Sequence, residues 1–586
     1  MDGSMGIGRL QHIALGALAG LVFWVLTGLS DDLAQGRVHL GLTVLAAAFF
    51  GTALAMVGQM RPRLALAAAA AVAVPVALLM VLESLGFADA GAFLGAGHPV
   101  VAGVIVTALP VPFLMAMGQH GVQGWRDYAA LFVNSWNIVV RYAAAALFLG
   151  FVWVVLWLLA ALLNLVGITL LERLLGEAPV AWVLSGAVLG LGLSVVTEMS
   201  DLISAQLLLR LLRLLLPVVL GVVAVFVLVL PMRGLTALFG PISPAGILLA
   251  VAAAAISLIA IAVDQDDVEA AHAPVLTLSA RALALLLPVL GGLSGWALAL
   301  QVAQQGWTPG RVAAAAAVVA VLGYAVLYAL AVLAGRGWMG WVRRGNLAMA
   351  LVLLAGAALW LTPLVTPEAI ATRSQLARLE AGRSTPDDLP LWQFAHDWGK
   401  PGLAALARLQ AQARAPGQEA LARRLQALDQ AAGPWDPALE PLHPVPAAVM
   451  EALIDALAVV PRDRALPAGL LEAVAAPELE GWVSACSRRT PQGNPGCLLI
   501  LADLLPHQPG EEAVVLLDRW GQGLRSAPVL IQAEGVWRRG GSVVALAGGD
   551  LGEAALIDLV LAEGIALVPA GIQAVQAGGQ VFTVAP

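Results

Sequence analysis

The chain opens with a succession of long apolar runs, separated by short polar segments, that continues to about residue 365. A helix that crosses a hydrocarbon core of about 30 Å needs roughly 20 apolar residues. Eleven runs reach that length, near residues 12–29, 38–58, 64–86, 99–118, 141–166, 179–198, 214–232, 245–263, 282–303, 312–333 and 346–365. The pattern therefore predicts eleven membrane-spanning helices. Because Pro217 and Pro288 interrupt two runs, ten or twelve spans remain open.

The pattern changes after residue 365. Between about 368 and 480, Leu and Ala recur at helical spacing in stretches such as GLAALARLQAQAR, separated by Pro- and Gly-rich turns, which predicts short helical hairpins. Short strand-like runs such as EEAVVLLDRW and QVFTVAP follow, and they predict a small antiparallel sheet. The expected fold is an all-α polytopic membrane domain (1–365) followed by a soluble α+β region, helical over 366–480 and β-rich over 481–586.

Composition and charge agree with this division. The chain of 586 residues is 60% hydrophobic and 12% charged, whereas soluble domains carry about 25% charged residues. Residues 1–365 hold fifteen basic and fourteen acidic side chains, and residues 366–586 hold sixteen basic and twenty-four acidic ones. An acidic C-terminal region lacks the basic footprint that nucleic-acid binding requires, so we expect no nucleic-acid partner.

The arginines predict the orientation, because cytoplasmic loops keep an excess of Lys and Arg. If the N-terminus is cytoplasmic, the outer segments carry only Arg37, Arg173, Arg233 and Arg311. The inner segments then carry Arg9, Arg61, Arg63, Arg126, Arg141, Arg210, Arg213, Arg281, Arg336, Arg343 and Arg344. With an odd number of spans, the C-terminal region is predicted to lie in the periplasm of a bacterial inner-membrane protein. The inner loop 264–269 is acidic, and the sequence leaves open whether it is more than a solvated connection.

Both cysteines of the chain, Cys486 and Cys497, lie in the stretch CSRRTPQGNPGC. A periplasmic location is oxidising and favours a disulfide, and the Pro, Gly and Asn residues between the cysteines can bring the two ends together. Such a clip stabilises a domain by about 3 kcal/mol on the chain-entropy model. The alternative is a pair of unrelated buried thiols. Two cysteines without a nearby His do not supply four zinc ligands.

Several stretches resemble a bacterial family of polytopic inner-membrane proteins known only as a domain of unknown function. They are GWRDYAALFVNSWN (124–137), the segment through LLNLVGI, GWTPGRV (306–312) and SQLARLEAGR (374–383). The resemblance implies an architecture and a location, but no activity. Family members often carry a calcium-type acidic loop after the second cysteine. The corresponding stretch here, DLLPHQPGEE (503–512), has Leu, His and Pro where oxygen ligands are needed, so we expect neither a metal site nor a cofactor.

Four charged residues are candidates for a polar path or for lipid contact: Glu198, Asp201, Arg210 and Arg213. Ionisable groups within a bilayer often mark a transport path, and the two arginines share one helix face beneath a run of leucines, which suits anionic headgroups. The alternative for the two acids is a solvated helix end. Glu83, near the end of the third run, has the same alternative.

A second set of residues is predicted to anchor the protein at the membrane interface, where aromatic and basic side chains are enriched. Its members are Trp125, Arg126, Trp136, Arg336, Trp338, Trp341, Arg343 and Arg344. Within the sixth run, Gly186 and Gly190 have the spacing that lets a neighbouring helix approach closely.

We find no arrangement typical of catalysis in the sequence, and His396 and Asp397, which are adjacent, point apart on a helix. The favoured hypothesis is a non-enzymatic membrane protein in contact with lipids, whose residues 366–586 bind another envelope protein. One alternative is a transporter or lipid translocase. Another is a membrane-embedded enzyme acting on lipid-linked substrates, which requires a polar cavity with convergent acids or histidines at one membrane face.

Overall fold

The computed structural model describes residues 2–28, 36–198, 205–233, 244–431, 433, 447–474, 476–504, 511–518, 528–533, 536–542, 552–566, 575–577 and 580–582. The chain forms two compact units, Met1–Leu428 and Asp429–Pro586. The division therefore falls within the region predicted to be helical, rather than at 365 or 480. The reason is that the helices just after residue 366 pack on the membrane helices: the Gln375 side chain donates to the Gln305 carbonyl (2.9 Å) and the Lys400 N–H group to the Gly86 carbonyl (2.8 Å).

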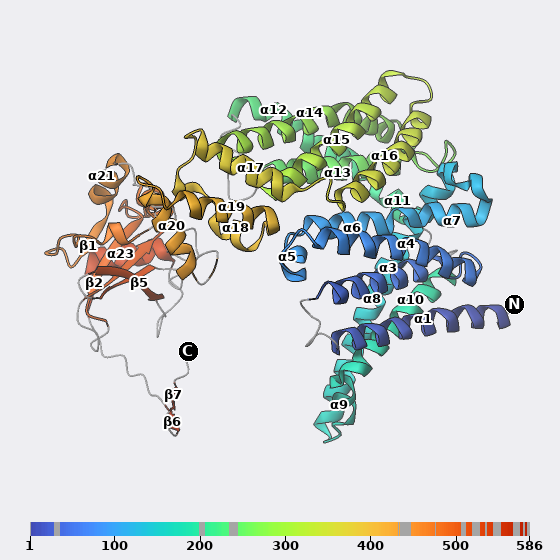
Figure 1. Cartoon of the computed structure of the whole chain (residues 1–586), viewed down its shortest axis with the longest axis horizontal. Helices are drawn as coiled ribbons and strands as arrows, with labels where there is room; N and C mark the ends of the chain where they lie inside the picture. The colour runs from blue at the N-terminus through green and yellow to red at the C-terminus, as the bar shows by residue number, and fades with distance from the viewer. Residues whose placement is uncertain are drawn as a thin grey trace. The chain divides into compact units, whose positions relative to one another are not determined.

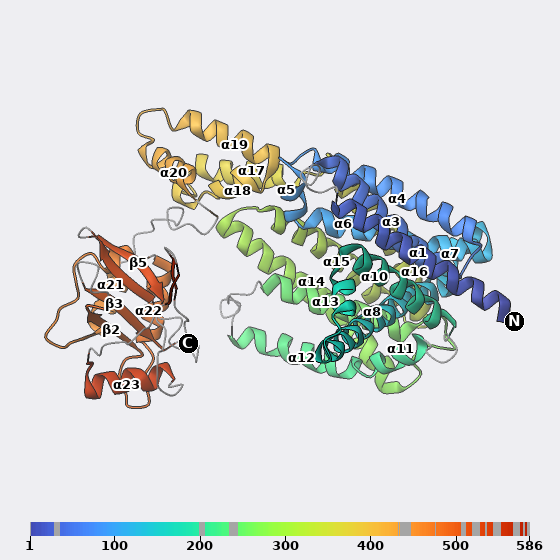
Figure 2. The same cartoon turned by 90° about the horizontal axis from the view of Figure 1, so that it is seen from below.

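The described residues of the first unit form helices and their connections (Figures 1 and 2). The helices that make up its long apolar segments are α1 (Asp2–Gly28), α3 (Arg37–Met56), α4 (Pro62–Ser84), α6 (His98–Ala108), α7 (Pro110–His120), α8 (Tyr128–Leu165), α10 (Ala178–Glu198), α11 (Ala205–Arg213), α12 (Leu216–Arg233), α13 (Pro244–Val263), α14 (Pro274–Gln305), α15 (Pro309–Leu333) and α16 (Trp338–Trp360). Its other helices are α5 (Ala90–Gly95), η1 (Val122–Arg126), α9 (Leu170–Gly176), α17 (Pro367–Glu380), η3 (Pro386–Asp388), α18 (Leu391–His396), α19 (Gly399–Gln412) and α20 (Glu419–Gln430).

Eleven helical segments among the described residues are long and apolar enough to cross a membrane. The predicted helical membrane domain is thereby confirmed. The fourth segment consists of α6 and α7, and proline occupies the first position of α7, where its missing N–H group costs no hydrogen bond. Helix α8 has 38 residues and is about 57 Å long at 1.5 Å per residue. It is therefore longer than the hydrocarbon core that it crosses.

Helices α1 and α10 approach each other through glycines. A Cβ atom added to Gly16 would lie 2.1 Å from the Gly186 carbonyl oxygen, and one added to Gly190 would lie 2.1 Å from the His12 carbonyl oxygen. At Gly20 the corresponding contact is the Trp182 carbonyl oxygen at 2.2 Å. The predicted close-packing role of Gly186 and Gly190 is thus confirmed. Their partner is a second pair of glycines with the same spacing, which lets the two backbones touch.

Large apolar side chains cover much of the outer surface of the membrane helices. On α8, Leu147, Phe151 and Leu158 are each 65% exposed or more. On α12, Val222 and Leu228 are exposed to a similar degree. Water would disfavour so extensive an apolar surface, whereas lipid tails match it. These faces are lipid contacts.

The second unit contains a five-stranded sheet and helices. Its elements are α21 (Ala447–Ala456), β1 (Ala458–Val460), η5 (Leu471–Ala473), α22 (Ala476–Cys486), β2 (Cys497–Ala502), β3 (Glu512–Leu517), β4 (Pro528–Ala533), β5 (Val536–Ser542), α23 (Glu553–Glu563), β6 (Val575–Ala577) and β7 (Gln580–Phe582). The strands of the main sheet are in the order β1-β2-β3-β4-β5, and β6 and β7 form a separate pair.

The main sheet is mixed rather than wholly antiparallel, because β1 joins β2 in parallel while the other pairs are antiparallel. Its strands alternate between two apolar clusters. Leu499 and Val515 face one cluster together with Trp482 of α22, and Leu498 and Leu516 face the other together with Ile557 and Val560 of α23. The sheet is therefore covered on both faces, and the unit has its own core. Figure 2 shows α23 beside the sheet.

Candidate functional site

Polar contacts in the first unit join helix ends at two opposite faces. At the face where α1 begins, Arg9 forms an ion pair with Glu198 at the end of α10. At the face where α16 ends, the Trp360 indole N–H group donates to His98 at the start of α6 (3.0 Å). Both contacts link ends that the alternation of eleven spans places on the same side of a membrane. We call the two sides the N-terminal face and the opposite face.

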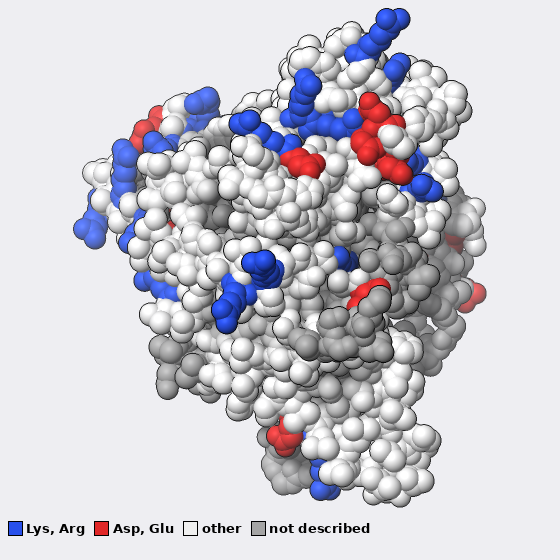
Figure 3. Space-filling view, turned by 90° about the vertical axis from the view of Figure 1, so that its right-hand side faces the viewer, with Lys and Arg blue, Asp and Glu red and all other residues white. Residues whose placement is uncertain are grey.

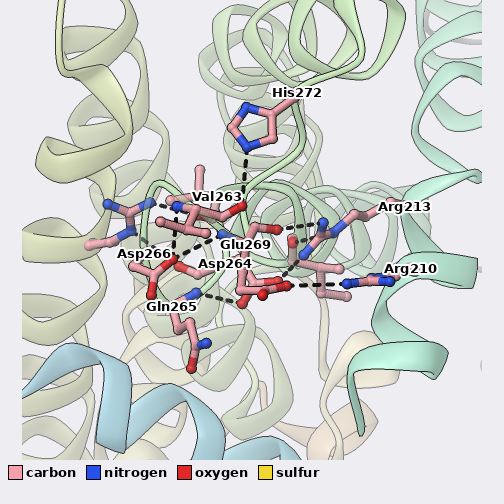
Figure 4. A network of polar contacts seen from close by, with 11 residues as sticks. Arg210, Arg213, Val263, Asp264, Gln265, Asp266, Glu269 and His272 are labelled. Atoms are coloured by element: carbon pink, nitrogen blue, oxygen red, sulfur yellow. Dashed lines mark hydrogen bonds and ion pairs between the residues drawn. The ribbon is translucent and has the colours of Figure 1, made fainter. Parts of the chain in front are cut away.

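The N-terminal face contains a network built around the end of α13 (Figure 4). The Arg213 guanidinium donates to the Ile261 carbonyl (3.0 Å) and to the Glu269 carbonyl (2.8 Å). It also forms an ion pair with Asp264, and both side chains are more than 90% buried. The last carbonyl groups of a helix lack intrahelical partners and carry partial negative charge. Arg213 satisfies one of these carbonyl groups and neutralises the adjacent carboxylate.

Arg343 of α16 reaches the same helix end from another side. It donates to the Val263 carbonyl (2.8 Å), the Asp264 carbonyl (3.2 Å) and the Asp267 carboxylate (2.7 Å). Arg210, which is exposed, lies 3.4 Å from the Glu269 carboxylate. The acidic loop 264–269 is therefore fixed to α11 and α16 by three arginines.

The candidate polar path is not assembled as one group in the part of the chain that the structure describes. Glu198 pairs with Arg9 and lies 3.5 Å from the Ser194 hydroxyl, whereas Arg210 and Arg213 bind the 264–269 loop. Asp201 lies outside the described residues. Each of the three described groups has an internal partner.

The predicted anchors include two arginine–tryptophan contacts at the N-terminal face, where basic side chains are widespread (Figure 3). Arg126 lies 4.6 Å from the ring centre of Trp125, and Arg344 lies 5.2 Å from that of Trp341. Arg336 is exposed. These groups are placed where interfacial anchors are expected, and their assignment as anchors stays a prediction.

Two of the predicted anchor tryptophans instead pack in the protein interior. Trp338 is 3% exposed within the largest apolar cluster, where Arg281 lies 5.4 Å from its ring centre. Trp136 is half-buried against the same cluster.

Asp127 caps the first turn of α8 at this face. Its carboxylate accepts from the Ala130 N–H group (3.2 Å) and lies 2.8 Å from His120. Burial by itself raises the pKa of Asp127, but these hydrogen bonds and the attraction of His120 outweigh it, so the pKa lies below its ordinary value.

The opposite face contains a buried histidine–glutamate pair that sequence reasoning missed. His98 Nε2 lies 2.9 Å from Glu368 Oε1, and the side chains are 8% and 2% exposed. An indole N–H group can only donate, so the contact from Trp360 requires His98 Nδ1 to be an unprotonated acceptor. The proton is then on Nε2 and is donated to the Glu368 carboxylate. With Nδ1 as an acceptor and Nε2 as a donor, the imidazole of His98 is in its neutral form.

Glu368 also lines a cavity of about 360 Å³ formed by the α5–α6 turn, the start of α15, the start of α17 and the α18–α19 turn. The lining residues are Gly95, Ala96, Thr308, Pro309, Gly310, Glu368, Pro390, Gln393, Asp397 and Trp398. Burial raises the pKa of Asp397, while the neighbouring His396 acts in the opposite direction. The His396 ring stacks on Trp392 at 3.9 Å between ring centres. Of the two adjacent residues, Asp397 lines the cavity and His396 does not.

His98 and Glu368 could not be recognised from local sequence, since they are 270 positions apart. Only their positions in the predicted topology could have indicated that they meet. His98 is the first residue of α6 and Glu368 lies in the first turn of α17, and both helices begin at the same predicted face. Glu83, buried at the end of α4, lies close enough to Glu368 for the two carboxyl groups to interact.

In the second unit, Cys486 and Cys497 are joined at the disulfide distance of 2.04 Å, as predicted. The loop between them is held by Asp558 of α23, which accepts from the Asn494 side chain (2.7 Å) and from the Thr490 hydroxyl (2.5 Å). Burial by itself raises the pKa of Asp558, but these hydrogen bonds outweigh it, so the pKa lies below its ordinary value. The greater part of the 503–512 stretch lies outside the described residues, and no group of three or more metal-ligating side chains occurs among those described.

Eleven apolar helices with lipid-matched outer surfaces define an integral, multi-pass membrane protein. No family model matches the chain, and no curated protein or solved structure is found to be similar to it. The resemblance to a bacterial inner-membrane family therefore stays a prediction.

Proposed function

We propose that this protein is a bacterial inner-membrane anchor that holds a folded unit, residues 429–586, in the periplasm, where that unit contacts another component of the cell envelope. The observation that carries the proposal is the pairing of an odd number of spans with a separate C-terminal unit that has its own two-sided core and a cysteine pair at disulfide distance. An odd number of crossings separates that unit from the N-terminus, and an oxidising compartment suits the cysteine pair.

The partners of the charged residues favour this role over transport. A translocation path needs ionisable groups that face a cavity or exchange partners. Glu198 and Arg213 instead hydrogen-bond to neighbouring protein groups, and Arg213 is 7% exposed. These contacts tie the ends of α10 and α13 to neighbouring helices, as expected for a rigid anchor.

Two matched substitutions test the topology. Arg336→Cys places a thiol on the exposed N-terminal face, and Arg414→Cys places one on the exposed turn after α19. In intact cells we expect a membrane-impermeant maleimide to label the Arg414→Cys variant, and to label the Arg336→Cys variant only after lysis. The wild-type protein should label only after reduction. The reverse pattern would place the C-terminal unit in the cytosol and refute the proposal.

The envelope contact is tested separately with a photo-reactive residue at Arg489 or at Glu451, both exposed in the second unit. We expect a discrete adduct in living cells from at least one of these positions. The same residue at Arg336 serves as the control on the predicted cytoplasmic side. Adducts from Arg336 alone, or from none of the positions, would contradict a periplasmic contact.

A further inference from the structure

The charged residues that line the cavity at the opposite face are all acidic within the described chain. Glu368 and Asp397 line it together with Gln393 and Trp398, and neither lysine nor arginine is among its lining residues within the described chain. Acidic side chains that are shielded from water usually pair with a cationic group.

Glu368 is not balanced by its own partner. One carboxylate oxygen accepts from His98 (2.9 Å), and the Trp360 contact keeps that imidazole neutral. The Glu368 side chain is 2% exposed, and Glu368 is one of the residues that line the cavity. Within the described residues its second oxygen has no hydrogen-bond partner. A carboxyl group with one hydrogen-bond donor can still accept further hydrogen bonds, and a buried carboxylate is stabilised when a cation pairs with it.

Two arginines at the same face have partners outside the cavity lining. Arg37 donates to the Phe87 carbonyl (3.0 Å), and Arg311 donates to the Gly306 carbonyl (2.7 Å) and to Gln305. Lys400 is exposed and is not part of the lining.

We propose that the cavity binds a small organic cation, a primary ammonium or guanidinium group carried by a small molecule, with Glu368 and Asp397 as its counter-charges. The volume of about 360 Å³ is within the usual range for small-molecule sites. Trp398 supplies an indole surface of the kind that attracts organic cations. A bare metal ion fits less well, because no group of three or more metal-ligating residues is found among the described residues. The site is built within the first unit and does not depend on the proposed anchoring role.

The test is calorimetric titration of the full-length protein in detergent with n-butylammonium, n-butylguanidinium and, as a neutral isostere, n-butanol. We expect at least one of the two cations to bind and n-butanol not to bind. Glu368→Gln keeps an acceptor for His98 but presents an amide to the cavity. It should weaken cation binding about tenfold or more, as loss of a charged hydrogen bond does.

Two further variants complete the test. Asp397→Asn removes the exposed counter-charge and should weaken binding severalfold. Glu380→Gln, on the same helix α17 but paired with Arg408 at the surface (2.9 Å), should leave the affinity unchanged. The thermal unfolding midpoint shows whether each variant is folded, and if Glu368→Gln does not fold, Asp397→Asn decides.

Three results would overturn the proposal. They are the absence of binding by both cations, equal binding of n-butanol, and an unchanged affinity in a folded Glu368→Gln or Asp397→Asn variant.

Discussion

Two charged groups of the membrane unit, one at each face, differ in their partners. At the N-terminal face, Arg213 and Arg343 donate to carbonyl groups at the end of α13 and to the acidic loop beyond it. At the opposite face, Glu368 has a neutral histidine as its partner and borders a cavity. Charges at the first face are matched within the protein, and they hold helices together. The cavity at the second face is lined by two acidic residues and, within the described chain, by no lysine or arginine, and this is the property expected of a site for a cation.

The largest effect should come from breaking the matched charges. Arg213→Met leaves Asp264 buried without its cation, and loss of one partner of a buried pair costs about 3 to 5 kcal/mol. Arg210→Met removes an arginine of the same helix whose side chain is 63% exposed, and we expect at most about 1 kcal/mol. Denaturant unfolding in detergent micelles measures both values. Equal losses would mean that the α13 end is not held by Arg213.

An intermediate effect is expected at the opposite face. His98→Phe leaves the Glu368 carboxylate without its hydrogen bond, which should lower the free energy of unfolding by about 1 to 3 kcal/mol. The matched control is His272→Phe at the N-terminal face, where an exposed ring contacts only the Val268 carbonyl (3.1 Å). That change should stay within about 0.5 kcal/mol. A His98→Phe variant as stable as the control would show that Glu368 needs no partner, and the contrast between the faces would fail.

The smallest effect is a difference in pH dependence between Asp127 and Asp397. The folded-state pKa of Asp127 is lowered, so its stabilising contribution is present above the unfolded value of about 3.9 and is lost as the pH falls through the folded value. The folded-state pKa of Asp397 is raised, so its contribution is complete below about 3.9 and is lost as the pH rises through the folded value.

Substitution by asparagine reveals the two signs. Asp127→Asn, which keeps an N-cap acceptor for α8, should be less stable than the wild type at neutral pH and should approach it in acid. Asp397→Asn should gain stability relative to the wild type as the pH rises from acid to neutral. Unfolding curves of both variants between about pH 3 and pH 7, on either side of the unfolded value of about 3.9, check the prediction, and parallel profiles would exclude it.

The sequence predicted what depends on neighbouring residues. A run of about 20 apolar residues specifies a spanning helix wherever it occurs, and the spacing of Gly186 and Gly190 indicated a close helix contact. The partner helix could not be predicted. Helix α1 has glycines with the same spacing, but nothing in the local sequence shows that the two pairs meet. The disulfide was predictable because few alternatives exist for two cysteines.

The remaining features depend on distant contacts. Arg213 and Arg343 lie 51 and 80 positions from the residues they hold at the end of α13. The sequence therefore left open whether the 264–269 loop is more than a solvated connection. In the second unit, helices α22 and α23 and strands β1 and β2 were missed. The apolar run CLLILA is too short to distinguish a buried strand from part of a helix by periodicity alone, and β1 has three residues.

The contact between α1 and α10 bears on how the protein is made. Arg9 and Glu198 are 189 positions apart, and ribosomes add about 5 to 20 residues per second. Helix α1 therefore waits on the order of 10 to 40 s for α10 to be synthesised at that rate. During this interval its glycine-lined side faces lipid or the insertion machinery, where other glycine-rich helices could occupy it. Correct assembly of this membrane unit then depends on order and timing during biosynthesis as well as on the stability of the finished fold.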